Sequence, residues 1–141
     1  MRKIFLFIAI SMYISAFSQI KWNSAYQQYI DQYKDIAIEQ MMRYHIPASI
    51  TLAQGLLESG AGRSELTRNS NNHFGIKCNN NWTGRRTYHD DDAKNDCFRV
   101  YDSAYDSYED HSKFLSGNQR YRPLFQLKTP DYKGWAKGPK A

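Results

Sequence analysis

The feature that most constrains this chain is the stretch from Ile46 to Lys77, in which an apolar segment runs into one acid and a glycine-rich turn. After Pro47 the apolar residues recur at helical spacing, which predicts a helix from about residue 47 to residue 59. Proline suits the first turn of a helix, and Gly60 or Gly62 can supply the left-handed residue that ends one. Because such a helix must bury its apolar face, we expect the other elements to pack around it.

Glu58 lies at the end of this predicted helix and is the sole acidic residue between Glu39 and Glu65. Apolar neighbours raise the pKa of a carboxyl group, so that it can keep its proton near neutral pH and act as a general acid. Taken alone, a glutamate near a helix end is more often solvated and structural. Gln54 stands one turn earlier, so we expect both side chains to point out of the helix together.

The start of the chain predicts export. A basic pair, Arg2 and Lys3, precedes an apolar run that ends at residue 17, and Ala16-Phe17-Ser18 has the small residues that a signal peptidase recognises. The run is shorter than the roughly 20 residues that span a bilayer, which favours a signal peptide of residues 1–18 over a membrane anchor. We therefore expect a periplasmic or extracellular protein that is associated with the cell wall.

Charge limits the class of partner. Loss of Arg2 and Lys3 with the signal peptide lowers the formal net charge from +5 to +3. This mildly basic balance does not predict nucleic-acid binding, and it suits an anionic polymer such as a wall glycan with peptide carboxylates. Residues 19–141 are enough for a single domain, which we expect to be a monomer without a cofactor. The last helical pattern stops close to Ala141, so we expect the natural domain to continue further.

Cys78 and Cys97 are the two cysteines of the chain. An even number in an exported protein favours a disulfide, worth about 3 kcal/mol through loop closure. Zinc is the alternative, because His73 and His89 lie nearby. The sequence has no CxxC or HExxH pair, however, and we expect no metal site.

Periodicity predicts further helices on both sides of a small β lobe, and therefore an α+β fold. A capping box at Asp106 and Glu109 is expected to begin one of these helices. Polar segments are expected to form loops at residues 63–72 and 118–122. The remaining predicted elements are helices at about residues 22–44, 106–117 and 129–136, and strands at residues 74–78 and 97–101.

The predicted β lobe carries aromatic and acidic candidates. Trp82 and Tyr88 stand among turn-forming residues, where aromatic rings can stack on sugars, although core aromatics are equally common. Asp90, Asp91 and Asp92 follow His89. We interpret this acidic run as a solvated turn, since it lacks the alternating ligand spacing of a calcium loop.

Several separated motifs, in order, resemble the glucosaminidase domain of glycoside hydrolase family 73, a family of bacterial peptidoglycan hydrolases. The resemblance covers about residues 46–135, nearly all of the predicted mature chain. Its motifs are LAQGLLESGAGRSEL, SNNHFGIK, a Trp-Thr-Gly turn, FRVYDSAYDSYEDHSKFL and QRYRPLF.

The resemblance implies a lysozyme-like fold, in which a mainly helical lobe and a small β-hairpin lobe flank a glycan groove. It implies cleavage of the β-1,4 bond between N-acetylglucosamine and N-acetylmuramic acid, with Glu58 as the general acid. The family motif at Asn72, Phe74 and Gly75 would line the groove floor. The tyrosine of the family's Arg-Tyr pair matches Tyr121, which would stabilise positive charge or position the substrate.

The second catalytic group is left open by the resemblance. Family members often have a glutamate in the β lobe, where this chain has Asp90 and Asp91, and we choose these two as candidates. The 2-acetamido group of the substrate could instead act as the nucleophile. Lytic or muramidase-type cleavage of the same polymer and a non-catalytic glycan-binding module are the alternative functions.

Overall fold

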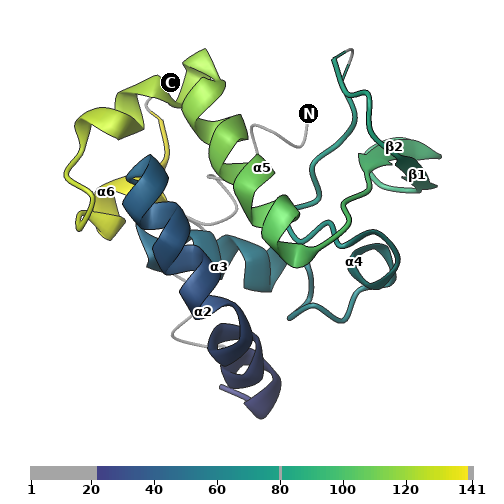
Figure 1. The fold of residues 1–141 in the computed structure, drawn as a ribbon, viewed down its shortest axis with the longest axis horizontal. Coiled ribbons are helices and arrows are strands. Elements are labelled where there is room, and N and C mark those ends of the chain that lie inside the picture. Colours follow the sequence, from purple (N-terminus) through teal and green to yellow (C-terminus); the bar gives the residue numbers. More distant parts are fainter. Residues whose placement is uncertain (1–21, 80, 140–141) are drawn as a thin grey trace.

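The computed structural model describes residues 22–79 and 81–139. Within these residues the fold contains helices and one two-stranded antiparallel sheet, which confirms the predicted α+β class (Figure 1). None of the helices in this part of the chain is long and apolar enough to cross a membrane. The predicted signal peptide, residues 1–18, lies outside the described residues. In chain order the elements are α2 (Ser24–Tyr44), α3 (Ala48–Glu58), α4 (Glu65–Ser70), β1 (Arg86–His89), β2 (Asp96–Arg99), α5 (Ala104–Gly117), the 3-10 helix η1 (Gln119–Gln126) and α6 (Tyr132–Lys137).

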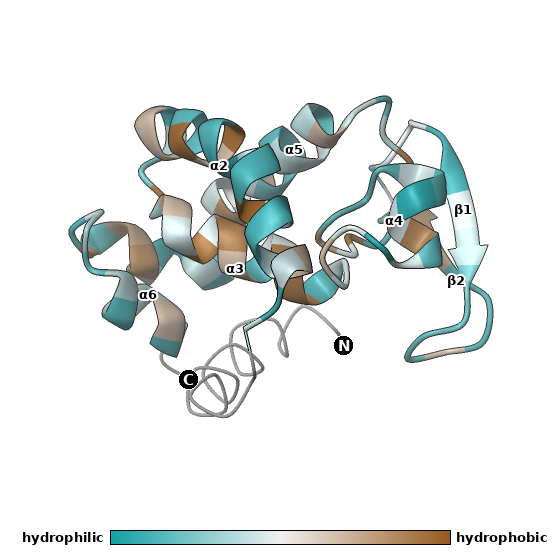
Figure 2. Ribbon diagram, turned by 90° about the horizontal axis from the view of Figure 1, so that it is seen from below, coloured by the Kyte–Doolittle hydropathy of each residue, from teal (hydrophilic) through white to brown (hydrophobic). Residues whose placement is uncertain are grey.

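The two helices predicted around His45 are confirmed. Asn23 caps the start of α2 by accepting a hydrogen bond from the backbone N–H of Tyr26. His45 ends α2 in a left-handed conformation with φ of 61°, and Pro47 then stands directly before α3. The reversal lays α3 against α2, and α5 packs on α2 as well. Figure 2 shows that hydrophobic and hydrophilic positions alternate along these helices.

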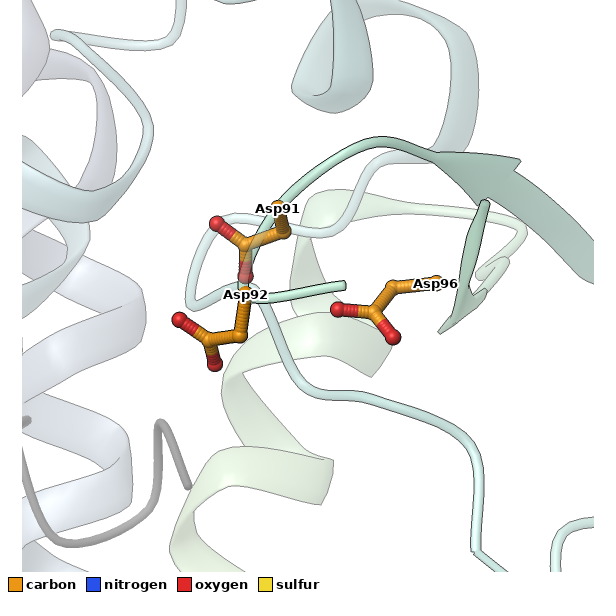
Figure 3. Close-up of side chains that lie close together, drawn as sticks. All are labelled: Asp91, Asp92 and Asp96. Atoms are coloured by element: carbon orange, nitrogen blue, oxygen red, sulfur yellow. The ribbon is translucent and has the colours of Figure 1, made fainter. Parts of the chain in front are cut away.

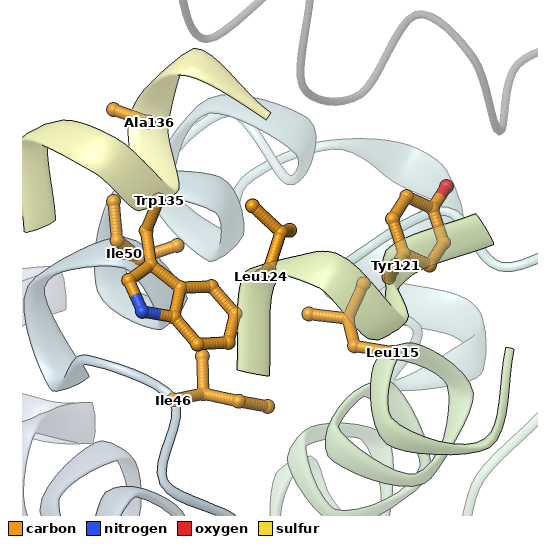
Figure 4. Close-up of a cluster of buried hydrophobic side chains, with 7 residues drawn as sticks. All are labelled: Ile46, Ile50, Leu115, Tyr121, Leu124, Trp135 and Ala136. Carbon is orange, nitrogen blue, oxygen red and sulfur yellow. The ribbon is translucent and has the colours of Figure 1, made fainter. Parts of the chain in front are cut away.

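A cluster of buried side chains closes the helical part at the end remote from the sheet (Figure 4). Trp135 of α6 is fully buried in it, and the Phe125 ring of η1 packs edge-on at 5.0 Å between ring centroids. Burying a large apolar side chain contributes roughly 1.5–3 kcal/mol, so this cluster fixes η1 and α6 firmly on α3 and α5. The cluster consists of Ile46, Ile50, Leu115, Tyr121, Leu124, Trp135 and Ala136.

Three sequence-based boundaries are wrong. The polar segment 63–72 contains α4, because Ser64 caps a helix by accepting from the N–H of Thr67. The segment 118–122 begins η1. Helix α5 starts earlier than predicted, since Ser103 caps it by accepting from the N–H of Asp106.

The β lobe differs from the prediction in one strand. β2 overlaps the predicted strand at residues 97–101, but its partner is β1, with Arg86 opposite Arg99, and not residues 74–78. Of the latter segment, Lys77 forms an isolated bridge to Phe98. The predicted disulfide is confirmed, and it ties Cys78 to Cys97 of β2 with 5.4 Å between the Cα atoms.

Candidate active site

Glu58 is the last residue of α3, and a tight turn follows it. The hydroxyl of Ser59 accepts from the N–H of Gly62 at 2.8 Å and donates to the carbonyl of Gly55 at 2.5 Å. Residues 60–62 all have φ between 56° and 76°, a region that costs a side chain energy at Ala61 but not at the two glycines. The turn places the half-buried Glu58 between the helical lobe and α4.

A buried network lies behind the last turns of α3. The hydroxyl of Tyr29 is 2.8 Å from His73 Nδ1 and 2.8 Å from the hydroxyl of Tyr108. It can come this close to α3 because position 55 is glycine, where an added Cβ would meet Tyr29 Oη at 2.5 Å. Burial lowers the pKa of His73 to about 4, so this imidazole is neutral at neutral pH. The network holds the turns that lead to Glu58.

The predicted outward orientation of Gln54 is wrong. Its side chain is fully buried, and its Oε1 atom lies 2.7 Å from His111 Nε2 on α5. Burial lowers the pKa of His111 to about 3, so His111 is neutral and donates this hydrogen bond. Gln54 and Glu58 do lie one helical turn apart on α3, but α5 covers the turn that carries Gln54.

The motif expected on a groove floor is also buried. The amide group of Asn72 donates to the carbonyls of Ile76 and Arg99, and its oxygen accepts from the N–H of Ile76. Phe74 stacks on His111 with 3.8 Å between ring centroids, and the buried Gly75 has φ of 62°. Asn72 and Phe74 therefore hold a turn and a core together, which contradicts groove-facing positions for their side chains.

The acidic run forms the turn between β1 and β2. Asp90 Oδ1 accepts from the N–H of Asn95 at 2.7 Å. Three other carboxylates, those of Asp91, Asp92 and Asp96, have oxygen atoms within 4.8 Å of one another (Figure 3). The ammonium group of Lys77 lies 3.6, 2.8 and 2.9 Å from these carboxylates respectively.

Lys77 and its carboxylates shift each other's pKa values. Desolvation lowers the pKa of Lys77, but the hydrogen bonds to Asp92 and Asp96 outweigh it and the net shift is upward. The hydrogen bond from Lys77 lowers the pKa of Asp96. One ammonium group of the protein thus compensates part of the negative charge of these three acids.

Two tyrosines of the predicted site differ in exposure. Tyr121 lies in the first turn of η1 and is buried beside Leu115, and its hydroxyl points away from that leucine (Figure 4). Burial raises the pKa of Tyr121, against the opposing effect of the neighbouring Arg120 charge. Tyr88 on β1 keeps 53% of its surface exposed and is free to contact a ligand.

Trp82 is half-buried and lines an open pocket of about 400 Å³. The residues of α5 that line this pocket lie on the side of the helix opposite the buried His111. The Arg99 guanidinium lies 4.8 Å from the centre of the Trp82 ring, and Trp82 Nε1 donates to the carbonyl of Arg85. A substrate contact of Trp82 stays a prediction. The other lining residues are Gly84, Arg85, Val100, Tyr101, Asp102, Asp106, Glu109, Asp110 and Lys113.

Comparison with known proteins decides the family. Residues 34–141 match the glucosaminidase family, described as mannosyl-glycoprotein endo-beta-N-acetylglucosaminidase. The chain belongs to this family. Its resemblance to glycoside hydrolase family 73 is thereby confirmed.

Curated relatives of this chain include the exo-glucosaminidase LytG of Bacillus subtilis, 33% identical over 116 residues, and the peptidoglycan hydrolase FlgJ of Vibrio parahaemolyticus, 29% identical over 111 residues. Both alignments cover 71% of this chain, but the chain spans only 39% and 36% of the lengths of these relatives.

Solved structures confirm the lysozyme-like fold of the family. The glycoside hydrolase domain of Salmonella typhimurium FlgJ is 26% identical with a TM-score of 0.63, and 79% of this chain aligns with 71% of that one. The catalytic domain of the autolysin Auto from Listeria monocytogenes is 28% identical with a TM-score of 0.60, and 85% of this chain aligns with 76% of that one.

The sequence does not single out the residues that support Glu58. Tyr29 falls within the helix predicted at about residues 22–44 without any assigned chemistry, and His73 enters the sequence analysis by name only as a possible zinc ligand. The available signal was Gly55, since a glycine inside an apolar helix often marks a close approach of another group.

Proposed function

We propose that this chain is an exported peptidoglycan hydrolase that cleaves the β-1,4 bond between N-acetylglucosamine and N-acetylmuramic acid. The observation that carries the proposal is the family match over residues 34–141, which includes Glu58 at the end of α3. The family relationship, and not this one glutamate, supplies the class of polymer. The proposal includes a signal peptide at residues 1–18, a single domain at residues 19–141, and action in the periplasm or outside the cell.

In the proposed reaction Glu58 protonates the oxygen of the leaving sugar. A second carboxylate on the other side of the sugar acts as base or nucleophile, depending on its separation from the acid. Asp91 is our first candidate, and its carboxylate lies 3.6 Å from the Lys77 ammonium group. Asp90 is the second candidate, although it already accepts a backbone hydrogen bond. The 2-acetamido group of the substrate can replace either carboxylate.

Two tyrosines complete the proposed site. The family resemblance gives Tyr121 the role of stabilising the positive charge on the sugar or positioning the substrate; because its side chain is fully buried, this role requires that the ring become accessible when the glycan binds. The exposed ring of Tyr88 stacks on the glycan, as aromatic rings commonly do. We do not propose substrate contacts for Gln54, Asn72 or Phe74, because their side chains are buried.

The decisive experiment compares Glu58→Gln with the wild-type protein on purified peptidoglycan. General-acid catalysis contributes about 100- to 10,000-fold, so the rate of turbidity loss should fall by at least about 100-fold. Glu65→Gln is the matched control, because Glu65 is an exposed glutamate in the first turn of the neighbouring α4. Equal clearing by Glu58→Gln and wild type would show that Glu58 is not the acid.

Analysis of the released fragments separates the competing chemistries. Cleavage at the proposed bond leaves N-acetylglucosamine at the new reducing ends. Muramidase action leaves N-acetylmuramic acid, and lytic action leaves an anhydro sugar without addition of water. A protein that sediments with peptidoglycan but releases no fragments would be a binding module.

A further inference from the structure

The last part of this chain carries an excess of positive charge. Asp131 is the one acidic residue that follows Asp110, whereas seven of the lysines and arginines do. Five of these seven belong to η1, α6 and the segment between them, and all five side chains are exposed. We call this surface the basic end; it consists of Arg120, Arg122, Lys128, Lys133 and Lys137.

Within the described structure the charged groups of the basic end are not paired with acidic side chains, although Arg120 lies beside Tyr121. No salt bridge in residues 22–79 and 81–139 involves any of the five. Asp131, the acid among them, caps α6 by accepting from the N–H of Gly134 at 3.0 Å. The single negative charge of Asp131 offsets only part of the five positive charges, and the excess favours binding of an external anion.

The basic end is also rigid and remote from the acidic turn. Its scaffold is held by buried Trp135 and Leu124 in the core cluster. Figures 1 and 2 both place α6 at one end of the molecule and the β1–β2 sheet, with its acidic turn, at the other. Because the backbone that carries these side chains is already packed, binding does not have to order it, as it would the backbone of a loose tail.

We propose that the basic end binds the free carboxylates of peptidoglycan stem peptides. This inference rests on the proposed function, because it takes peptidoglycan to be the polymer. Carboxylates recur along the wall, so several weak contacts can act together and hold the protein on its substrate. A membrane surface fits less well: the basic end exposes Tyr132 but no large aliphatic side chain with which to enter a bilayer.

The test uses two variants with the same loss of charge. The basic-end variant carries Arg122→Gln, Lys128→Gln, Lys133→Gln and Lys137→Gln, and spares Arg120, which lies beside Tyr121. The control variant neutralises four exposed cations elsewhere, which the structure shows in no salt bridge: Lys34→Gln, Arg63→Gln, Arg68→Gln and Lys94→Gln. Both are made in the Glu58→Gln protein, so that the polymer stays intact, and circular dichroism checks that both fold.

Binding is measured by sedimentation with purified peptidoglycan at low ionic strength, where charge contacts are least screened. The basic-end variant should bind about tenfold more weakly, and the control should stay within about twofold of its parent. Peptidoglycan whose carboxylates have been converted to amides should bind parent and basic-end variant equally. Equal weakening by both variants, or an unchanged difference on amidated polymer, would overturn the proposal.

Two further measurements distinguish a membrane partner and test the proposed hydrolase activity separately. Tighter binding to vesicles of anionic phospholipid than to peptidoglycan, lost in the basic-end variant, would replace the stem peptides with a membrane. Fragment release by the protein with Glu58 intact tests the proposed function separately. If fragments are released but the basic-end and control variants bind peptidoglycan equally, only the inference about the basic end is wrong. If the basic-end variant alone binds more weakly but no fragments are released, only the proposed hydrolase activity is wrong.

Discussion

His111 Nε2 lies 2.7 Å from Gln54 Oε1, and both side chains are fully buried between α5 and α3. Gln54 is one helical turn before Glu58, so this contact fixes the rotation of α3 about its axis where the proposed acid leaves it. The face of His111 is covered by the ring of Phe74. The hydrogen bond thus joins α5 to the helix that carries Glu58, and the stacked ring of Phe74 joins the turn after α4 to the same histidine.

Gln54→Ala should destabilise the fold. It removes a buried hydrogen bond, leaves His111 without its acceptor and opens a cavity, which together cost about 2–4 kcal/mol. Urea denaturation followed by circular dichroism measures this change. Gln28→Ala on the exposed face of α2 is the control and should stay within about 0.5 kcal/mol of wild type. Wild-type stability in Gln54→Ala would contradict a packing role for Gln54.

Stability should fall below about pH 6.5 because two buried histidines resist protonation. Burial lowers the pKa of His73 to about 4 and that of His111 to about 3, from an ordinary value of 6.5. At a pH between the folded and the unfolded pKa, the unfolded chain binds protons that the folded protein does not. The free energy of unfolding is therefore highest above pH 6.5 and decreases as the pH falls below it. Each histidine contributes a slope that approaches about 1.4 kcal/mol per pH unit.

The pH dependence is separable by mutation. Urea denaturation between pH 5 and pH 7 avoids the titration range of ordinary carboxylates. His73→Leu should lose about half of the slope, whatever its stability at pH 7. His45→Asn alters an exposed histidine and keeps a residue that tolerates the left-handed backbone, so it should retain the full slope. Parallel curves for wild type and His73→Leu would exclude His73 as a source of the slope.

The sequence was sufficient for the long helices because periodicity and local caps agree there. Asn23 and the His45-Ile46-Pro47 break define α2 and the start of α3 through interactions within a few residues. Helix α4 was missed because it has six residues, too few for an apolar period to appear. The cap of α5 was misplaced because Asp106 and Glu109 imitate a capping box, three residues after the serine that provides the cap.

The site was harder to predict because exposure depends on distant contacts. Helical spacing relates Gln54 to Glu58 but does not reveal that α5 covers the first of them. Asn72 reads as a polar groove residue, whereas its amide is saturated by the backbone of Ile76 and of Arg99, 27 residues later. Such a long-range acceptor leaves no local pattern in the sequence.

Gly55→Ala should be destabilising although alanine favours helices. The new methyl group would lie 2.5 Å from Tyr29 Oη and 2.9 Å from Tyr108 Oη, so both buried rings must shift. Such overpacking costs about 1–3 kcal/mol, more than the gain in helix propensity of up to about 1 kcal/mol. The midpoint of thermal unfolding measures the effect.

Gly117→Ala is the matched control for this change. Gly117 is the last residue of α5, and an added Cβ there has no heavy atom within 4 Å. It should be neutral or stabilising by up to about 1 kcal/mol, because only the propensity term remains. If both glycine variants behave alike, the contact between Tyr29 and α3 does not limit the space at position 55.

Removal of the disulfide should destabilise the β lobe. Cys78→Ser with Cys97→Ser opens a loop with a sequence separation of 19 residues, and loop-closure entropy assigns it about 3 kcal/mol. Limited proteolysis should then cut first within residues 81–95, the part that the disulfide encloses and the short sheet holds alone. A reducing agent should produce the same cleavage in the wild-type protein and no further change in the double variant. Equal resistance of the oxidised and reduced proteins would mean that the β1–β2 pairing and the Lys77 contacts suffice to hold the lobe.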